Sequence, residues 1–486
     1  MLKQAATIAL ILTQGLVQAA PITTPDPLIA KVTDLCKEQY YLADVKSQLQ
    51  QSRSRRARER QQLESAATNF KLAAQASPQA EKRCQYGALE AYVQHILSQN
   101  KQAADRADDN ALAAEEQLAI HIGKLETAQT ISTTILADQG STHGAESTSI
   151  LRINLKRKAG GTPICSKVTA MIDINPGSTA AQLDAIASIK VAEDTALQSS
   201  LFDDWLKISN TASCTNNGNY AKTFATAANG CELNNDETLS GHQNTIKPKR
   251  TATDAQLFSS DDQTKPCAEA QQPDANEPLG SAKRIKHTLC YALKTYKASV
   301  GSTAAISGQV LKQSNLVLNY LRNCMPKYSN IKKPEDATEA KALIEFVDKT
   351  YGESNEKFKE MFVTPLTTAK ATIRLNEKTK PKKIVNMVSV EDRAAVISHA
   401  EGVRNAKELE AAKKDAPETA IDSKNEEKCK GKPRGECKED KDCEYKDGKC
   451  QVKVTTATGT DGKTNTTASN SFVINKSTLL IAFLIL

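Results

Sequence analysis

Apolar residues recur at seven-residue intervals through the N-terminal part of the chain. The repeat occupies the following positions: Leu28, Leu35, Leu42, Leu49, Arg56, Leu63 and Phe70. All but Arg56 are apolar, and such a heptad pattern is typical of a helix that packs along its whole length against another helix. Pro27 suits a first helical turn and Ser77-Pro78 suits an end, so the pattern predicts one helix of about 50 residues, roughly 75 Å long.

A second helical pattern begins after Pro78 and continues without proline to about Leu136. Its apolar positions include Leu89, Tyr92, Ile96, Leu118, Ile122, Leu125, Ile131 and Ile135. Two long helices joined by a short turn pack side by side as an antiparallel hairpin. The two patterns together therefore predict a helical rod.

A strongly basic run, RSRRARER at residues 53–60, lies inside the first predicted helix. Such a run could bind nucleic acid or heparin, or it could be a solvated helix face. The whole chain has 64 basic and 57 acidic residues and a formal net charge of only +7, which gives no general case for nucleic-acid binding. We favour the solvated face and expect no nucleic-acid partner, because both chain ends indicate a secreted protein.

Glycines interrupt the helical patterns between about residues 137 and 278. Two stretches in this region alternate apolar and polar residues, 151–155 and 168–174, and they predict two strands of a small sheet. Further helical patterns, expected to lie against the rod or to follow it, cover residues 185–208, 281–323 and 335–414. The sequence therefore predicts a mainly helical protein with a small β-containing region.

Four cysteines lie within 22 residues that contain almost no large apolar side chains: Cys429, Cys437, Cys443 and Cys450. A segment with so little to bury needs cross-links to hold one shape, and we expect disulfides with the three possible connectivities left open. Zinc binding is disfavoured, because the sequence has no Cys-x-x-Cys pair and no His near this group. The preceding charged residues, 405–428, are interpreted as a linker.

Both ends of the chain carry the patterns of targeting signals that are removed. Residues 1–19 combine basic Lys3, an apolar run and small residues at Val17 and Ala19, which is typical of a secretory signal peptide. The C-terminal end has small residues at 469–471, a short spacer and an uncharged apolar run at 479–486, the order of a glycosylphosphatidylinositol (GPI) attachment signal. Neither run reaches the roughly 20 residues of a membrane-spanning helix. We expect the mature chain on the outer face of a membrane.

Cysteine usage agrees with a secreted protein. The total of 12 is even, and in an oxidising compartment an even number indicates disulfides. Besides the four near the C-terminus they are Cys36, Cys84, Cys165, Cys214, Cys231, Cys267, Cys290 and Cys324. Their 105 possible connectivities remain open, except that Cys36 and Cys84 lie at different distances from the turn at Pro78 and cannot meet in a regular hairpin. Aromatic residues are only 4% of the chain, which makes a mainly β architecture improbable.

The sequence shows no pattern of a catalytic or metal site. Its six histidines are scattered, without a His-Glu-x-x-His pair, and the chain has neither a Gly-x-Ser-x-Gly elbow nor a P-loop. Each isolated histidine is interpreted as a packing or surface residue. We therefore expect no enzyme activity, no catalytic residues, no metal and no cofactor.

One N-glycosylation sequon remains in the expected mature chain, at Asn465-Thr466-Thr467. Together with the residues that follow, as far as Ile474, it resembles the ending of the variant surface glycoproteins of African trypanosomes. The four-cysteine segment is similar to the small C-terminal domain of that family. The helical hairpin followed by Gly160-Gly161-Thr162-Pro163-Ile164-Cys165 resembles the family's N-terminal domain, and eight cysteines before residue 330 point to its more cysteine-rich class.

The resemblance implies a specific organisation of the chain. It implies a lipid attached at Ser469, a glycan at Asn465 and a disulfide from Cys36 to Cys165. The expected parts are a signal peptide at 1–19, an elongated helical N-terminal domain at 20–404, a linker at 405–428, a disulfide-rich domain and tether at 429–469, and a removed GPI signal at 470–486. The implied fold is a long antiparallel helical hairpin or coiled-coil bundle with a small β-containing region and a small disulfide-stapled C-terminal domain.

The resemblance also implies a function. A protein of this family is expected to be a GPI-anchored homodimer in a dense cell-surface coat that is exchanged for antigenically different versions, with host antibodies as external binders. We expect the loops at residues 137–150 and 209–280, rich in Asn, Gly, Thr and Asp, to be the antibody-accessible part. The alternative is a receptor-like surface protein on the same helical scaffold that binds a host macromolecule.

Overall fold

The computed structural model describes residues 26–148, 150–160, 168, 170–194, 197, 204–214, 223–243, 254–415, 429–441 and 443–452. The chain divides into two compact units, residues 1–403 and 404–486. The predicted signal peptide at 1–19 and GPI signal at 470–486 lie outside the described residues. Among the residues described, no helix is long and apolar enough to cross a membrane.

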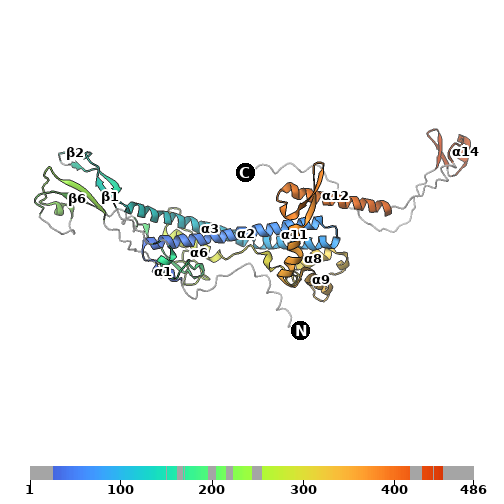
Figure 1. The fold of residues 1–486 in the computed structure, drawn as a ribbon, viewed down its shortest axis with the longest axis horizontal. Coiled ribbons are helices and arrows are strands. Elements are labelled where there is room, and N and C mark those ends of the chain that lie inside the picture. Colours follow the sequence, from blue (N-terminus) through green and yellow to red (C-terminus); the bar gives the residue numbers. More distant parts are fainter. Residues whose placement is uncertain are drawn as a thin grey trace. The chain divides into compact units, whose positions relative to one another are not determined.

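Two long helices lie side by side along the first unit, α2 at Leu35–Ala76 and α3 at Ala80–Ser132 (Figure 1). They confirm the predicted hairpin and its turn near Pro78. The prediction of one helix from Pro27 is wrong, because a short helix α1 at Pro27–Lys31 ends before α2 begins. The reason is Asp34, whose carboxylate accepts hydrogen bonds from the backbone N–H groups of Cys36 and Lys37 and so starts a new helix.

The predicted heptad positions form the buried seam of this hairpin. All seven of them, including Arg56, are at most 6% exposed. Two apolar clusters lie along the seam, one containing Leu42 and Leu49 and the other containing Leu63 and Phe70. The charged side chain of Arg56 therefore separates two apolar cores.

Short strands follow the C-terminal end of α3. In antiparallel pairs, β1 (Thr134–Asp138) lies beside β4 (Leu155–Ala159), β2 (Gly144–Ser147) beside β3 (Ile150–Arg152), and β6 (Asp204–Ser209) beside β7 (Thr238–Gln243). The second helix thus ends at Ser132. The prediction that it includes Ile135 is wrong, because Ile135 lies in β1 and pairs with β4. The predicted strand at 151–155 is divided at residues 153 and 154 between β3 and β4.

Two other predictions between residues 168 and 208 are wrong in part. Of the described residues at 168–174, Met171–Asp173 form a 3₁₀ turn, η1, in place of a strand, and the Asp173 carboxylate closes it by accepting a hydrogen bond from the Ala170 N–H. The expected helix at 185–208 begins at a 3₁₀ turn, η2 (Leu183–Ala185), and contains β5 (Ser188–Lys190) and the beginning of β6. Asp194 and Leu197 are helical as expected, and residues 195–196 and 198–203 lie outside the described residues. The β5 strand pairs with β8 (Asp254–Gln256) and buries Ile189, so tertiary pairing overrides the local helical pattern.

Helices between residues 282 and 324 pack against the rod, as predicted (Figure 1). The expected helix at 281–323 is broken into α6 (Ala282–Thr295), η3 (Thr303–Ala305), α7 (Gly308–Leu311) and α8 (Asn315–Cys324). Each break has a local cause, since Ser302, Ser307 and Ser314 cap the elements that follow them. A helix of this length was predicted because the apolar spacing continues across these serines.

The predicted helical region 335–414 also contains strands. Its elements are η4 (Pro326–Tyr328, just before it), α9 (Lys341–Tyr351), α10 (Asn355–Phe358), η5 (Lys359–Val363), α11 (Thr364–Thr368), β9 (Lys370–Leu375), β10 (Lys378–Lys383), η6 (Ile384–Asn386) and α12 (Val390–Asp415). The β9–β10 hairpin turns at Asn376, which has a positive φ of 57°, a conformation that Asn tolerates better than most residues. Because α12 continues to Asp415, residues 405–415 of the predicted linker are helical.

The cysteine-rich part of the second unit contains helix α14 (Arg434–Glu439) and strands β11 (Cys443–Lys446) and β12 (Lys449–Val452). The two strands form an antiparallel hairpin whose turn uses Asp447 and Gly448, both at positive φ. Taken together, the units confirm a mainly helical fold with small β elements.

Candidate functional site: the head and the disulfide framework

The strands after α3 form one assembly, which we call the head and define as residues 134–160, 204–214 and 223–243. Strand β7 packs across β1 as well as pairing with β6. Gly241 of β7 makes this contact possible, because a Cβ atom there would overlap the backbone of Leu136 in β1. The head lies at one end of the hairpin rod (Figure 1).

Several large apolar side chains are exposed on the head. They are Ile150 (53% exposed), Leu151 (59%), Trp205 (44%), Ile208 (38%), Phe224 (86%) and Leu233 (63%). A soluble protein rarely gathers such residues on its surface without a function for them. These side chains give the head apolar surface that another macromolecule could contact.

A charged turn closes the β1 end of the head. Asp138 accepts hydrogen bonds from the backbone N–H of Gly140 (2.6 Å) and from Nε2 of His143 (2.8 Å). These bonds, the Gly140 N–H first, hold the pKa of Asp138 below its ordinary value. The turn is thus ordered by an ionised carboxylate at an exposed site.

Four pairs of cysteines tie loops and small elements to their surroundings. Within the head, Cys214 bonds Cys231. The turn end of the rod is joined to the end of α8 by Cys84–Cys324. In the second unit the bonds are Cys429–Cys443 and Cys437–Cys450. The sequence left these connectivities open.

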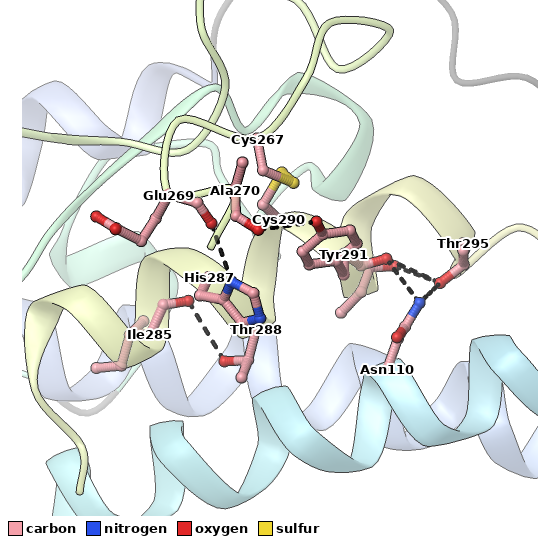
Figure 2. Close-up of a disulfide and its surroundings, with 11 residues drawn as sticks. Asn110, Cys267, Glu269, Ala270, Ile285, His287, Thr288, Cys290, Tyr291 and Thr295 are labelled. Atoms are coloured by element: carbon pink, nitrogen blue, oxygen red, sulfur yellow. Dashed lines mark hydrogen bonds between the residues drawn. A yellow bond between two sulfur atoms is a disulfide. The ribbon is translucent and has the colours of Figure 1, made fainter. Parts of the chain in front are cut away.

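A fifth bond, Cys267–Cys290, fastens a loop to α6 (Figure 2). Beside it, Nδ1 of His287 lies 2.9 Å from the carbonyl oxygen of Glu269, and the Tyr291 hydroxyl donates to the carbonyl of Ala270 (3.3 Å). The amide of Asn110 on α3 donates to the carbonyl of Tyr291 (3.3 Å). Figure 2 therefore shows how one disulfide and a few hydrogen bonds connect loop, helix α6 and rod.

The remaining predicted site residues cannot be placed by the structure. Cys36 is disulfide-bonded, but Cys165 lies outside the described residues, so the pairing of Cys36 with Cys165 stays a prediction. Asn465 and Ser469 also lie outside the described residues. The proposed glycan and lipid sites therefore remain predictions.

The interpretation of the basic run at residues 53–60 as a solvated face is correct for exposed Ser54, Ala57 and Arg58 and wrong for Arg56, which is buried. Fully buried Arg56 pairs with Asp108 on α3 (2.7 Å) and donates to the carbonyl of Tyr296 (3.0 Å). Cross-helix pairs join Arg53 to Glu115 (2.9 Å) and Arg60 to Asp105 (2.8 Å). These contacts are the polar layer between the two apolar cores. The sequence did not identify these partners, because Arg56 lies 22 residues before Pro78 and Asp108 lies 30 residues after it, so the pairing depends on how the two helices are staggered.

A buried histidine and a buried glutamate outside this layer join helices and loops of the first unit. His121 and Glu38 are both fully buried, with Nε2 and Oε1 2.8 Å apart, and Nδ1 of His121 lies 3.1 Å from the carbonyl of Gly280. The same Glu38 oxygen accepts from the Ala192 N–H (2.8 Å). This pair joins α2, α3 and two loops. Among the described residues, no group of three or more His, Cys, Asp or Glu could hold a metal ion.

Comparison with known proteins gives matches in both units. The family model for Variant surface glycoprotein ETAT matches residues 420–486. Variant surface glycoprotein ETAT 1.2 of Trypanosoma brucei rhodesiense is 51% identical over 45 residues, covering 9% of this chain and 82% of that relative. Variant surface glycoprotein ILTAT 1.22 of Trypanosoma brucei brucei is 28% identical over 271 residues, 55% of this chain and 53% of the relative.

The similarity to ILTAT 1.22 covers only part of each sequence. The chain matches about half the length of ILTAT 1.22. Among solved structures, Variant Surface Glycoprotein VSGsur bound to suramin is similar with a TM-score of 0.58 and 15% identity, covering 78% of this chain and 100% of that chain. At this identity the likeness concerns the fold alone.

Proposed function

Because the chain belongs to the variant surface glycoprotein family, we propose that it is a GPI-anchored coat antigen that forms a protective cell-surface layer and takes part in antigenic variation. The observation that carries this proposal is the match of residues 420–486, which includes the cysteine domain and the apolar end, to the family model. The relatives are named as surface glycoproteins, which supports a non-enzymatic role. Further support comes from the arrangement of the first unit.

The hairpin rod supports a role in a dense layer. Its α3 helix has 53 residues, about 80 Å at 1.5 Å per residue. A rod of this length standing on the membrane covers little area per molecule and holds its far end away from the lipid. We propose that it acts as a homodimer, as its family resemblance implies, on the outer leaflet of the plasma membrane.

The position of the head supports antibody access. The start of α12, Ala395 and Val396, packs in the same apolar cluster as Phe70 and Cys84 near the turn of the hairpin. The head follows the other end of the hairpin, after Ser132. Because the first unit ends at Val403, only seven residues after Val396, we propose that the turn end faces the membrane and the head faces outward. Host antibodies are therefore proposed to bind the head, including its part of the loops at 137–150 and 209–280.

Release by a phosphatidylinositol-specific phospholipase tests the anchor. Intact cells that express the protein are treated with the enzyme, and the C-terminal peptide of the released chain is analysed by mass spectrometry. We expect release of a chain of residues 20–469 whose last residue, Ser469, carries the anchor remnant, with a glycan at Asn465. A chain that stays on the cell, or that retains residues 470–486, would show that the C-terminal signal was misinterpreted.

Antibody competition tests the outward head. Sera raised against whole cells are absorbed with the wild-type ectodomain or with a variant carrying Phe224→Lys and Leu233→Lys, two exposed positions in the head. We expect the variant to remove clearly fewer antibodies, whereas a control with Val388→Lys, exposed near the start of α12, absorbs as well as wild type. Equal absorption by all three proteins would contradict the proposed orientation.

A further inference from the structure

A groove lies where the polar layer interrupts the apolar seam of the rod. Its cavity volume is ≈ 550 Å³, within the range of about 300–1,000 Å³ common for small-molecule sites. One wall is α2 and the other comes from η2 and the segment after α6. The lining residues are Gln48, Gln51, Ser52, Arg55, Arg58, Leu183, Tyr296 and Lys297.

Three of these lining side chains are cations and none is a carboxylate. Arg55 is fixed in place, since it pairs with Glu59 (3.0 Å) and donates to the carbonyl groups of Tyr296 and Ala298 (3.1 Å each). Lys297 pairs with Asp184 (3.0 Å), which lies outside the lining. Arg58 is exposed and forms no ion pair with any described residue. Its guanidinium therefore offers its N–H donors to a ligand.

The groove also has an aromatic and apolar surface beside these charges. The Lys297 ammonium lies over the ring of Tyr296, 5.6 Å from its centroid, and buried Leu183 lines the same space. Burial raises the pKa of Tyr296, and the neighbouring Asp184 carboxylate raises it further, so its hydroxyl stays protonated at physiological pH. The walls are held together by Gln48, whose Nε2 donates to the carbonyl of Ala181 (2.7 Å).

A second groove on the opposite helix provides a comparison. It has a similar volume, ≈ 580 Å³, and is lined by residues of α3 alone: Ser98, Lys101, Gln102, Asp105, Arg106, Asp109 and Asn110. Its two cations are balanced by two carboxylates, and no aromatic ring lines it. The polar layer by itself therefore does not produce a cationic, aromatic groove.

We propose that the groove beside Arg58 binds a small aromatic anion, with a sulfonate or phosphate group held by Arg58 and Lys297 and the ring placed against Tyr296 and Leu183. Guanidinium groups match the geometry of tetrahedral oxyanions, and an aromatic body gains from burial against apolar surface. This site is separate from the proposed coat role, and its test does not depend on the anchor or on antibodies.

Isothermal titration of the mature protein with naphthalene-1,5-disulfonate tests the proposal. We expect saturable binding of one molecule per chain, weakened about tenfold by Arg58→Glu because a charge-assisted contact is replaced by repulsion, and weakened by added salt. Arg106→Glu is the matched control, since it makes the same change on an exposed position of the second groove, and it should leave binding unchanged. Circular dichroism confirms that both variants remain folded.

Three results would overturn the proposal. They are no saturable binding at millimolar ligand, equal affinity of the wild type and the Arg58→Glu variant, and an equal loss from Arg106→Glu, which would indicate a general charge effect. Inorganic sulfate serves as a second probe. We expect it to bind more weakly than the aromatic ligand, and equal binding of both would show that Tyr296 and Leu183 contribute nothing.

Discussion

The rod and the cysteine domain of this protein are stabilised in opposite ways. In the rod, helices α2 and α3 bury a long series of apolar side chains, and its two clusters contain residues such as Leu49, Leu63 and Phe70. In the domain at residues 429–452, the buried cluster consists of Cys429, Cys437 and Cys443, with Cys450 packed against it. Hydrophobic burial therefore accounts for the first region, and covalent cross-links replace it in the second.

The comparison shows what each kind of region can tolerate in its sequence. A helix with an apolar seam can vary its outward face without losing its core. A disulfide domain without an apolar core has few buried side chains to keep between its cysteines, although turn residues such as Gly448, at positive φ, remain constrained. Both properties suit a protein whose surface differs among family members.

Removing one disulfide from the cysteine domain should have the largest effect. The double variant Cys437→Ser and Cys450→Ser loses about 2–5 kcal/mol, more than a region of this size without an apolar core can supply. We expect residues 429–452 to lose hydrogen-exchange protection while α2 and α3 keep theirs. Exchange measured by mass spectrometry on the whole protein checks this.

The matched control removes the head disulfide with Cys214→Ser and Cys231→Ser. This change should leave protection in residues 429–452 unaltered. If the cysteine domain keeps its protection without the bond between Cys437 and Cys450, then another source of stability exists there and the comparison fails.

Removing the partner of buried Arg56 should destabilise the rod but leave it folded, because its two apolar clusters remain. Asp108→Ala leaves a buried guanidinium without its carboxylate, and we expect a loss of about 3–5 kcal/mol in urea unfolding followed at the helical signal. Asp109→Ala is the control, because this neighbouring carboxylate is exposed and its removal should change stability by less than about 0.5 kcal/mol. Equal effects of the two substitutions would mean that the ion pair does not contribute to the rod.

An exposed ion pair on the same helix should contribute much less. Lys101, whose side chain is 71% exposed, pairs with Asp105 one turn away. Solvent screening limits such pairs to about 0–1 kcal/mol, so Lys101→Ala should barely shift the urea midpoint. A shift as large as that of Asp108→Ala would show that burial is not what separates the two pairs.

The smallest effect is expected at the charged turn of the head. The pKa of Asp138 is lowered in the folded protein, so its stabilising contribution is present above the ordinary carboxyl pKa of about 3.9 and is lost as the pH falls through the lower folded value. The protection factor of the Gly140 amide, which is its exchange rate relative to an unprotected amide at the same pH, should therefore fall only in acid. In the Asp138→Asn variant this acid-dependent change at Gly140 should be absent. A change that persists in the variant would mean that another group causes it.

The sequence predicted those parts of the fold in which local pattern and tertiary packing agree. The heptads from Leu28 to Phe70 identified the rod and its turn, because each of these residues is buried in the hairpin seam. The helix predicted at residues 185–208 does not include β5. The local pattern there is helical, but β5 is stabilised by pairing with β8, which lies more than 60 residues away. The β9–β10 hairpin was missed although Pro381 in KTKPKK disfavours the interior of a helix and its lysines are typical of an edge strand.

The candidate sites were predictable to different degrees. The composition around Cys429 to Cys450 was sufficient to predict a cross-linked domain, but the pairing depends on a hairpin turn at Asp447 and Gly448 that brings Cys443 and Cys450 onto adjacent strands. Arg56 could be recognised as the exception in the seam, whereas its pairing with Asp108 depends on the register between two helices. The groove beside Arg58 could not be found from the sequence, since its walls come from segments more than 100 residues apart.

The central proposal, that this chain is a coat protein, is tested most directly by counting it on the cell. Surface proteins of intact cells expressing the chain are labelled with a membrane-impermeant reagent, recovered and quantified by mass spectrometry. If the chain is the coat, it should dominate the labelled protein, and phospholipase treatment should remove most of it. A scarce protein at the same surface would contradict a coat function and would favour the receptor-like alternative.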